Sequence, residues 1–493
     1  MTNASDILPN IIDGKGVKGA VSGAAIKSVD PFDGSVCWSS TSADSQIVDR
    51  AVSAGRAAFP KWAALQVQER GAIITRFTKL VESRAAELAE IISRECGKPL
   101  WDSRTEVNSL VTKLTATAEA FERRATSTSR EVRGLTSRTR FLPHGLMAVL
   151  GPFNFPMSMA NSHIMPALYA GNTVVFKPSE RTPLCGLLVG QIWQDAGLPP
   201  GVLNVVSGGS DTGQALVQHP NVDGVLFIGS HRGGLSILRA LVDHPEKIVA
   251  LEMGGNSPLV VWDYDDVKVA AYIALQSSII SSGQRCSAAR RLIIPKKDTK
   301  LLDQLTQMFK RVKVGHYKDS PEPFYGPLIR PQAADILMAR AAELVQGGAV
   351  SIIAPKVEGP IRSMVTPGLL DVTTCKSDAD EEVFGPLLKV IKVDSFEEAI
   401  AVSNKTKFGL AAGVVTRDRK KFDRFFSEAR AGIVNWNQQL TGATTFAPFG
   451  GTKNSGNYRP AGYLSVDYCS YAVASFEVDQ PKLPDNPPSG LTW

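Results

Sequence analysis

The chain has 493 residues, of which 43% are hydrophobic and 21% are charged, so it is long enough to form two or three domains with hydrophobic cores. The net charge is only +6 and the basic residues are scattered, which argues against a nucleic-acid groove or a polybasic membrane patch. No segment approaches the roughly 18 consecutive apolar residues of a membrane span. We expect a soluble globular protein that binds neither nucleic acid nor membranes.

The six cysteines and six histidines show no spacing typical of a disulfide framework or a metal site. The N-terminal sequence MTNASDILPN also lacks the basic and apolar regions of a secretory signal. We therefore expect a reduced, cytoplasmic protein without a metal, whose chemistry comes from side chains or from an organic cofactor.

The N-terminal part of the chain is predicted to be helical. Between Ser45 and about Gly97, apolar residues recur at three- and four-residue steps, which indicates an amphipathic helical hairpin. The following segment, residues 123–140, is rich in Arg, Ser and Thr and has no helical stripe. It could be either a linker or an extended arm.

Short apolar runs then alternate with helix-length segments between residues 146 and 252, at 146–150, 173–176, 202–206, 225–228 and 248–251. Such alternation predicts a parallel, doubly wound sheet, in which ligands bind at the carboxyl ends of the strands. A second alternating region follows, from about residue 256 to 456. Two α/β domains are therefore predicted to meet near residue 255. The stretch Tyr468–Glu477 is β-rich, and the tail KLPDNPPSG after it is not expected to be helical.

Cys286 is a candidate nucleophile in the polar segment SGQRCSAARR. Arg285, Arg290 and Arg291 are close to it in sequence, and positive charge favours the reactive thiolate. A cysteine packed as a small hydrophobic residue is the more common case, and we interpret the other five cysteines in that way.

Two further polar side chains follow predicted strands. Glu252 comes directly after a buried run, where a partly desolvated carboxyl has a raised pKa and can act as a general base; a structural carboxylate is an equal alternative. Asn154, in the loop GPFNFP, offers an uncharged N–H donor suited to an oxyanion hole. A turn-forming or helix-capping Asn is the alternative there.

A dinucleotide could bind along the same strand ends. Glu180 of the segment KPSE could bind ribose hydroxyls and would repel a 2′-phosphate, which favours NAD over NADP. The segment GSHRGG opens the helix after the fourth strand, where backbone N–H groups could hold a pyrophosphate. Because no GxGxxG fingerprint is present, a simple helix-start turn is an equal alternative. The candidate cofactor residues are Lys177, Glu180, Gly229, Ser230, His231, Arg232, Gly233 and Gly234.

Seven motifs occur in the order GPFNFP, VVFKPSE, FIGS, LEMGG, GQRC, EEVFGP and APFGG. Together they resemble the aldehyde dehydrogenase superfamily over nearly the whole chain. The resemblance implies an NAD-binding domain at residues 1–122 and 144–255, a catalytic domain at 256–467, and a small β-rich oligomerisation element at 123–143 and 468–493. Exposed strand edges in that element imply a homodimer or homotetramer.

The resemblance also implies the roles of the site residues. Cys286 would attack an aldehyde, and the side-chain amide of Asn154 with the Cys286 backbone N–H would hold the oxyanion. Glu252 would activate the water that releases the thioester, and Glu382 and Phe384 would position the nicotinamide and its ribose. Covalent capture is needed because an aldehyde carbon becomes a good hydride donor only after a nucleophile adds to it.

A closer resemblance is to the succinylglutamate semialdehyde dehydrogenases of arginine catabolism, through segments such as NSHIMPAL, GQRCSAARRL and VNWNQQLTGA. It implies a substrate with carboxylates. Arg459 is the first candidate to bind one of them, although it could equally brace the PFGG loop, and Lys113 and Lys453 are weaker candidates. Another small or anionic aldehyde, a thiol hydrolase without redox chemistry, and a silent oligomeric scaffold are the alternative functions.

The sequence departs from the commoner superfamily pattern at several positions. His163 and Asn256 stand where many relatives carry Lys, and Pro460 stands where a Glu is common. Ile228 replaces the usual Thr, and Tyr458 stands where the closer family more often has His. The loss of the Lys that follows NFP, together with the Glu, implies that any proton relay in the pocket is built differently.

Overall fold

The computed structural model describes residues 7–132, 135–376, 379–483, 486 and 488–492. Parts of the predicted oligomerisation element and Pro-rich tail (133–134, 484–485, 487 and 493), of the predicted catalytic domain (377–378) and of the N-terminal sequence (1–6) lie outside the described residues. Within the described ranges, no helix is long and apolar enough to cross a membrane.

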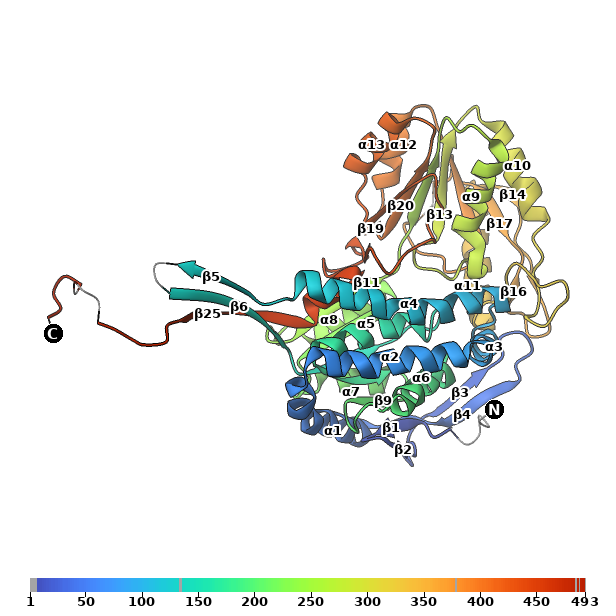
Figure 1. Ribbon diagram of the computed structural model, residues 1–493. Helices are drawn as coiled ribbons and strands as arrows, with labels where there is room; N and C mark the ends of the chain where they lie inside the picture. Colours follow the sequence, from blue (N-terminus) through green and yellow to red (C-terminus); the bar gives the residue numbers. More distant parts are fainter. Residues whose placement is uncertain (1–6, 133–134, 377–378, 484–485, 487, 493) are drawn as a thin grey trace.

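The first sheet has seven strands and belongs to the lower body in Figure 1. Five neighbouring strands are parallel, and two N-terminal strands extend that sheet in antiparallel fashion. The chain winds from β7 to β8 and β9 on one side and to β10 and β11 on the other, so the carboxyl ends of β7 and β10 form a switch point where ligands bind. In spatial order the strands are β11 (Ile248–Met253), β10 (Gly224–Gly229), β7 (Leu146–Leu150), β8 (Thr173–Lys177), β9 (Leu203–Val206), β1 (Asn10–Ile12) and β2 (Lys15–Val17).

Helices cover this sheet and enclose a large apolar core. The core contains Phe77 and Trp193, whose stacked rings have centroids 3.9 Å apart. The helices are α1 (Ser45–Ala64), α2 (Val67–Ser83), α3 (Ala85–Cys96), α4 (Leu100–Arg124), α5 (Ser158–Ala170), α6 (Pro183–Asp195), α7 (Ser210–Gln218) and α8 (His231–Ala240).

The N-terminal helices differ from the sequence-based expectation. The predicted helical hairpin over residues 45–97 is wrong, because this segment forms three helices, α1, α2 and α3. The chain is extended at Leu65 and Gln66, and it turns again at Arg84. The apolar periodicity continues on both sides of these turns, and no glycine marks either of them. Gln66 begins α2 with a reciprocal capping box to Glu69. The 25-residue helix α4 was not predicted.

The second sheet lies in the upper body of Figure 1 and is also doubly wound. Six strands are parallel and the edge strand β14 is antiparallel to β17. Its strands are, in spatial order, β14 (Val350–Ile353), β17 (Gly368–Asp371), β18 (Leu387–Val393), β13 (Ala289–Pro295), β12 (Ser257–Val261), β20 (Ala411–Val415) and β21 (Ile433–Trp436). The helices of this region are α9 (Val267–Ile279), α10 (Thr299–Lys310), α11 (Pro331–Gln346), α12 (Phe396–Asn404) and α13 (Arg419–Glu428). The two sheets confirm the predicted α/β class.

A three-stranded antiparallel sheet extends away from both bodies in Figure 1. It consists of β25 (Ser470–Glu477), β6 (Leu135–Pro143) and β5 (Thr128–Val132). Of the two interpretations of residues 123–140, the extended arm is therefore confirmed for β5 and β6, while Arg123 and Arg124 end α4. All residues of β5 are exposed, so the edge of this strand is free to pair in the monomer. Its role in oligomerisation and the exact domain boundaries remain predictions.

Short strand pairs and one-turn helices complete the described structure. Two of these elements matter for the site: β24 (Ala461–Gly462), which pairs with β22 (Pro448–Phe449), and the 3-10 helix η3 (Tyr463–Tyr468) that follows it. The other pairs are β3 (Ala25–Val29) with β4 (Val36–Thr41), β15 (Val357–Glu358) with β16 (Met364–Val365), and β19 (Phe408–Gly409) with β23 (Thr452–Lys453).

Candidate active site

A cavity of about 980 Å³ lies at the carboxyl ends of the first sheet, where the two α/β units meet. Its lining includes residues that follow β7, β8, β9, β10 and β11, and residues from the turns that precede β13 and β18. Cys286, Asn154, Glu252 and Glu382 all line it. The structure therefore brings together in one cavity four side chains that are far apart in the sequence.

Cys286 is half-buried in the segment between α9 and β13. This segment begins with a turn (η2, Ile280–Gly283) in which Ser281 and Ser282 have φ angles of 53° and 57°, in the left-handed region. Such a conformation is strained and persists only where other contacts enforce it. Here the Ser281 hydroxyl donates to Asp102 Oδ2 at 2.5 Å, and the Ser282 hydroxyl donates to the Gly326 carbonyl at 2.7 Å.

The three arginines near Cys286 in sequence have other partners. Arg285 forms a 2.8 Å ion pair with Asp102 of α4, which is fully buried. Arg290 donates to the Gly385 and Arg285 carbonyls. Arg291 donates to the Asn256 carbonyl and to carbonyls at the end of α12. Their guanidinium groups thus brace the loops around Cys286.

The surroundings of Cys286 favour the thiol over the thiolate. Burial raises its pKa to about 12, and the carboxylates of Glu382 and Glu252 add to the increase. A charge interaction does join Arg290 to Cys286, but burial and the two carboxylates outweigh it, so the nearby arginines do not lower the pKa of the thiol. Arg285 is paired with Asp102 and Arg291 donates to backbone carbonyls, whereas Arg290 also lies near Glu382.

Asn154 is held directly beside the cysteine loop. Its side-chain amide donates to the carbonyl of Gln284 at 2.9 Å, two residues before Cys286. The start of α5 after this loop is fixed by Glu106, whose Oε1 accepts the backbone N–H groups of Met157 and Ser158 at 3.0 and 3.2 Å. One N–H of the Asn154 amide is thus engaged, and the other can serve an oxyanion.

Glu252 is the last residue but one of its strand, β11, and lines the cavity. Burial holds the pKa of its carboxyl well above the usual range. Oε1 accepts the backbone N–H of Ala461 at 3.2 Å, while Oε2 is buried and has no hydrogen-bond partner among the described residues. A Cβ at Gly450 would lie 2.7 Å from Oε1, so glycine at that position gives the carboxyl its room. A protonated or water-bonded Glu252 is the state that this environment favours.

Glu382 and Phe384 reach the cavity from the other unit. Burial raises the pKa of Glu382 to about 7, against the opposing effect of Arg290, whose Nη2 lies 3.9 Å away. A Cβ at Gly254 would lie 1.8 Å from Glu382 Oε2, so only glycine permits this approach. The Phe384 ring meets that of Phe153 edge-on, with centroids 5.8 Å apart.

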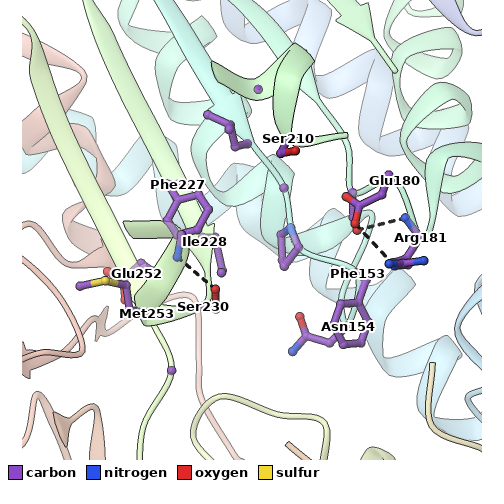
Figure 2. Close-up of a pocket in the computed structure, with 18 of the residues that line it drawn as sticks. Phe153, Asn154, Glu180, Arg181, Ser210, Phe227, Ile228, Ser230, Glu252 and Met253 are labelled. Carbon is purple, nitrogen blue, oxygen red and sulfur yellow. Dashed lines mark hydrogen bonds and ion pairs between the residues drawn. The ribbon is translucent and has the colours of Figure 1, made fainter. Parts of the chain in front are cut away.

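The predicted dinucleotide residues divide into two groups. Lys177, Glu180, Gly229, Ser230 and Gly233 line the cavity, whereas His231, Arg232 and Gly234 are not among its lining residues. The Ser230 hydroxyl caps α8 by accepting the Gly233 N–H at 3.2 Å, as the dashed line in Figure 2 shows.

At the other end of the cavity, Glu180 is half-exposed and forms a 3.5 Å ion pair with Arg181, which is visible in Figure 2. Lys177 is buried, and its ammonium donates to the carbonyls of Pro178 and Gly208 at 2.9 Å each. Lys177 is therefore occupied by backbone carbonyls, and Arg181 is the cation closest to the Glu180 carboxylate.

The substrate candidates do not line the cavity. Arg459 is exposed, and its guanidinium donates to the Val249 carbonyl at 3.3 Å, which favours the bracing role over carboxylate binding. Lys453 donates to two backbone carbonyls before β19. Lys113 is buried within α4 and donates to the Gly462 carbonyl at 2.8 Å.

Comparisons with known proteins decide the family. The model of the aldehyde dehydrogenase family matches residues 19–473. The chain belongs to the aldehyde dehydrogenase family. A curated relative, N-succinylglutamate 5-semialdehyde dehydrogenase of Shigella boydii, is 45% identical over 473 residues, which is 96% of each chain. The sequence-based recognition is thereby confirmed, and with it the prediction of an oxidoreductase enzyme.

Solved structures of this family have the same fold. An indole-3-acetaldehyde dehydrogenase in complex with NAD+ is 31% identical, with a TM-score of 0.90 over 95% of this chain and 96% of the other. A glyceraldehyde-3-phosphate dehydrogenase of Bacillus halodurans in complex with NADP is 27% identical, with a TM-score of 0.88 over 95% and 99% of the two chains.

Some residues of the site were not found by sequence reasoning. Asp102 and Glu106, one turn apart on α4, hold the cysteine loop and the asparagine loop from behind. Arg181 pairs with the predicted ribose ligand Glu180. The spacing of Asp102 and Glu106 on one helix face is the only signal that could have indicated them, and it is shared by many solvated helices.

Proposed function

We propose that this chain catalyses the NAD-dependent oxidation of N-succinyl-L-glutamate 5-semialdehyde to N-succinyl-L-glutamate in arginine catabolism. The observation that carries the proposal is that Cys286, Asn154, Glu252 and Glu382 line one cavity at the switch point of the first sheet. The choice of substrate is supported by the 45% identity to a relative of that name. We place the enzyme in the cytoplasm, where thiols stay reduced, as a homodimer or homotetramer.

The first stage of the proposed reaction is covalent capture. The Cys286 thiolate adds to the aldehyde carbon and forms a thiohemiacetal, whose oxyanion accepts hydrogen bonds from the Asn154 amide and the Cys286 backbone N–H. Because burial raises the pKa of the thiol to about 12, its proton must pass to solvent water before the sulfur attacks the carbon. Protonation of Glu382, whose pKa is near 7, removes one of the charges that oppose the thiolate.

Loss of hydride from the thiohemiacetal carbon, which a bound nicotinamide would accept, leaves a thioester on Cys286. The second stage is release of the acid. Oε2 of Glu252, which has no protein partner among the described residues, takes a proton from water, and the water oxygen bonds to the thioester carbon. The carbon–sulfur bond then breaks, and its electron pair returns to Cys286. Oε1 stays bonded to the Ala461 N–H, which fixes the orientation of the carboxyl group.

The cavity fits a dinucleotide along the ends of β8, β9 and β10. Gly209 lines it, and a Cβ added there would meet no protein atom within 4 Å, so that a side chain would occupy space in which a cofactor could lie. Glu180 can accept ribose hydroxyls, and the N-terminal N–H groups of α8 can face a pyrophosphate. When bound, the nicotinamide supplies the hydride acceptor. Glu382 and Phe384, which line the cavity, would position its ribose and ring.

The experiment that tests this function measures NADH formation by the purified protein with N-succinylglutamate semialdehyde beside related and neutral aldehydes. We expect the highest kcat/KM with the succinylated substrate and no activity in Cys286→Ala. Equal efficiency with neutral aliphatic aldehydes would refute the substrate. Full turnover of esters with no NADH from any aldehyde would instead identify a thiol hydrolase.

A further inference from the structure

Behind Glu252 lies a group of buried polar side chains that the reaction above does not use. Lys113 of α4, His163 of α5 and Tyr468 of η3 are each at most 3% exposed. None of them is among the residues that line the cavity. We call these three side chains the rear cluster.

The rear cluster and Glu252 meet at the same two-residue strand. Glu252 Oε1 accepts the N–H of Ala461, and the Lys113 ammonium donates to the carbonyl of Gly462, the next residue of β24. The α5 helix, which carries His163, also packs on β24. His163 Nδ1 and the Tyr468 hydroxyl are 2.8 Å apart. The carboxyl of the base and a buried amine are thus bonded to neighbouring backbone groups of the same strand.

Several polar atoms along this path have no hydrogen-bond partner within the described ranges. They are Glu252 Oε2, the second ring nitrogen of His163 (Nε2), and the hydroxyl of Thr117, one turn after Lys113. Buried polar atoms in native proteins are nearly always bonded, to protein or to ordered water. These atoms can therefore take part in hydrogen bonds with ordered water.

Lys113 is also unlike a structural lysine. Lys98, on the loop before α4, is buried as an ion pair with Glu106 at 2.8 Å. Lys113 has one backbone carbonyl as its partner in the described part of the chain. Its ammonium is therefore poorly compensated, and burial lowers the pKa to about 8, against a smaller opposing effect of Cys469. No charged side chain of the helices packed on α4 contributes. Part of the population thus carries a neutral amine near neutral pH.

The other groups of the rear cluster stay uncharged. Burial, with a smaller effect of Lys113, lowers the pKa of His163 to about 3. Burial raises the pKa of Tyr468 well above its usual range, with smaller increases from Cys469, Glu252 and Asp467. Burial likewise raises the pKa of Cys469, against Lys113. A neutral imidazole can accept a proton on one ring nitrogen and release one from the other, so this pair can pass a proton without holding charge.

We propose that Lys113, assisted by the His163–Tyr468 pair, accepts the proton that Glu252 removes from the attacking water. The water O–H bond breaks toward Glu252 Oε2, and the water oxygen bonds to the thioester carbon. The carbon–sulfur bond breaks, and the electron pair stays on Cys286. The carboxyl proton then moves to the neutral amine of Lys113, which becomes an ammonium, and Glu252 is again a base. This inference rests on the thioester step of the proposed function.

The test separates acylation from deacylation in Lys113→Met. With p-nitrophenyl acetate and no dinucleotide, the nitrophenolate burst reports acylation of Cys286, and the steady rate reports deacylation. We expect an unchanged burst and a steady rate lowered about 10- to 100-fold. Because the neutral amine is the acceptor, the wild-type steady rate should rise with pH through about 8, and this rise should be lost in the variant.

Lys247→Met is the matched control. Lys247 is also buried in the first unit. In the described contacts it donates only to backbone carbonyls, those of Val217 and His219. Its pKa is likewise lowered chiefly by burial. We expect wild-type deacylation and a wild-type pH profile in this variant. A steady rate and pH profile in Lys113→Met equal to those of Lys247→Met would overturn the proposal.

Two further measurements keep the proposal testable. If Lys113→Met shows no burst because it fails to fold, the wild-type profile decides, and a steady rate without a rise near pH 8 refutes the role of Lys113. Tyr468→Phe should slow deacylation by a smaller factor than Lys113→Met does, with the burst intact. An unchanged deacylation rate refutes the claim that the His163–Tyr468 pair assists the proton transfer. Slowed ester deacylation in Lys113→Met without NADH from any aldehyde would support the relay while refuting the dehydrogenase function.

Discussion

Asp102→Asn tests whether α4 holds the cysteine loop in place. The carboxylate is fully buried and accepts both the Ser281 hydroxyl and the Arg285 guanidinium, and the Arg285 side chain is only 13% exposed. Burial opposes the charge of Asp102, but Arg285 and Lys98 outweigh it, so the pKa of the carboxyl is lowered. The substitution keeps the size of the side chain and leaves the guanidinium buried without its counter-charge.

Breaking one partner of a buried ion pair costs about 3 to 5 kcal/mol. For a domain of about 150 to 250 residues, a loss of this free energy of unfolding corresponds to a fall in Tm of roughly 6 to 20 °C. The strained turn at Ser281 also loses its bond to the carboxylate, so we expect the loop to loosen and kcat to fall with it.

The assay combines thermal unfolding followed by tryptophan fluorescence with kcat measured well below the transition. Asp303→Asn, on the exposed face of α10, is the control, and its stability should change by less than about 0.5 kcal/mol. If the free energy of unfolding of Asp102→Asn lies within about 1 kcal/mol of the wild-type value, the reasoning about the buried ion pair is refuted.

Three other predictions concern the cavity. Glu180→Gln should raise kcat/KM with NADP relative to NAD, because the repelling carboxylate is lost while Arg181 remains; an unchanged ratio from steady-state kinetics would remove the argument for NAD. Asn154→Ala should lower kcat about 10²- to 10³-fold while Cys286 still reacts with iodoacetamide, and a smaller loss would contradict the oxyanion role. Glu382→Gln should lower the pKa of Cys286, because it removes an anion that opposes the thiolate. Alkylation of Cys286 should then reach half its maximal rate at a lower pH than in the wild type, and a shift in the other direction would contradict the assigned electrostatics.

The strand framework could be predicted from the sequence because the buried parallel strands leave a strong local signal. Runs such as 146–150 and 248–251 are apolar and bounded by turn residues, and they coincide with β7 and lie within β11. The three N-terminal helices could not be separated, since the break at Leu65 and Gln66 lacks Gly or Pro and is decided by packing against the rest of the unit. The antiparallel strand β1 was missed because its pairing with β9 joins residues 194 to 196 positions apart.

The site was predictable where a residue follows a strand end, and not where its surroundings decide the chemistry. Cys286, Asn154 and Glu252 reach the cavity because the loops that carry them follow predicted apolar runs or lie between them. The net electrostatics of Cys286 could not be predicted, because the sequence shows neither where the three arginine side chains point nor that burial and two carboxylates outweigh Arg290. For the same reason the sequence could not show that the Arg459 guanidinium, predicted to bind a substrate carboxylate, donates to the Val249 carbonyl.

The most direct test of the central claim is intact-protein mass spectrometry of Glu252→Gln mixed with the aldehyde and dinucleotide. The account predicts that NADH forms once per active site and that the acyl group accumulates as a thioester on Cys286, because the water is no longer activated. An acyl group on another residue, or repeated turnover with no covalent species, would contradict it.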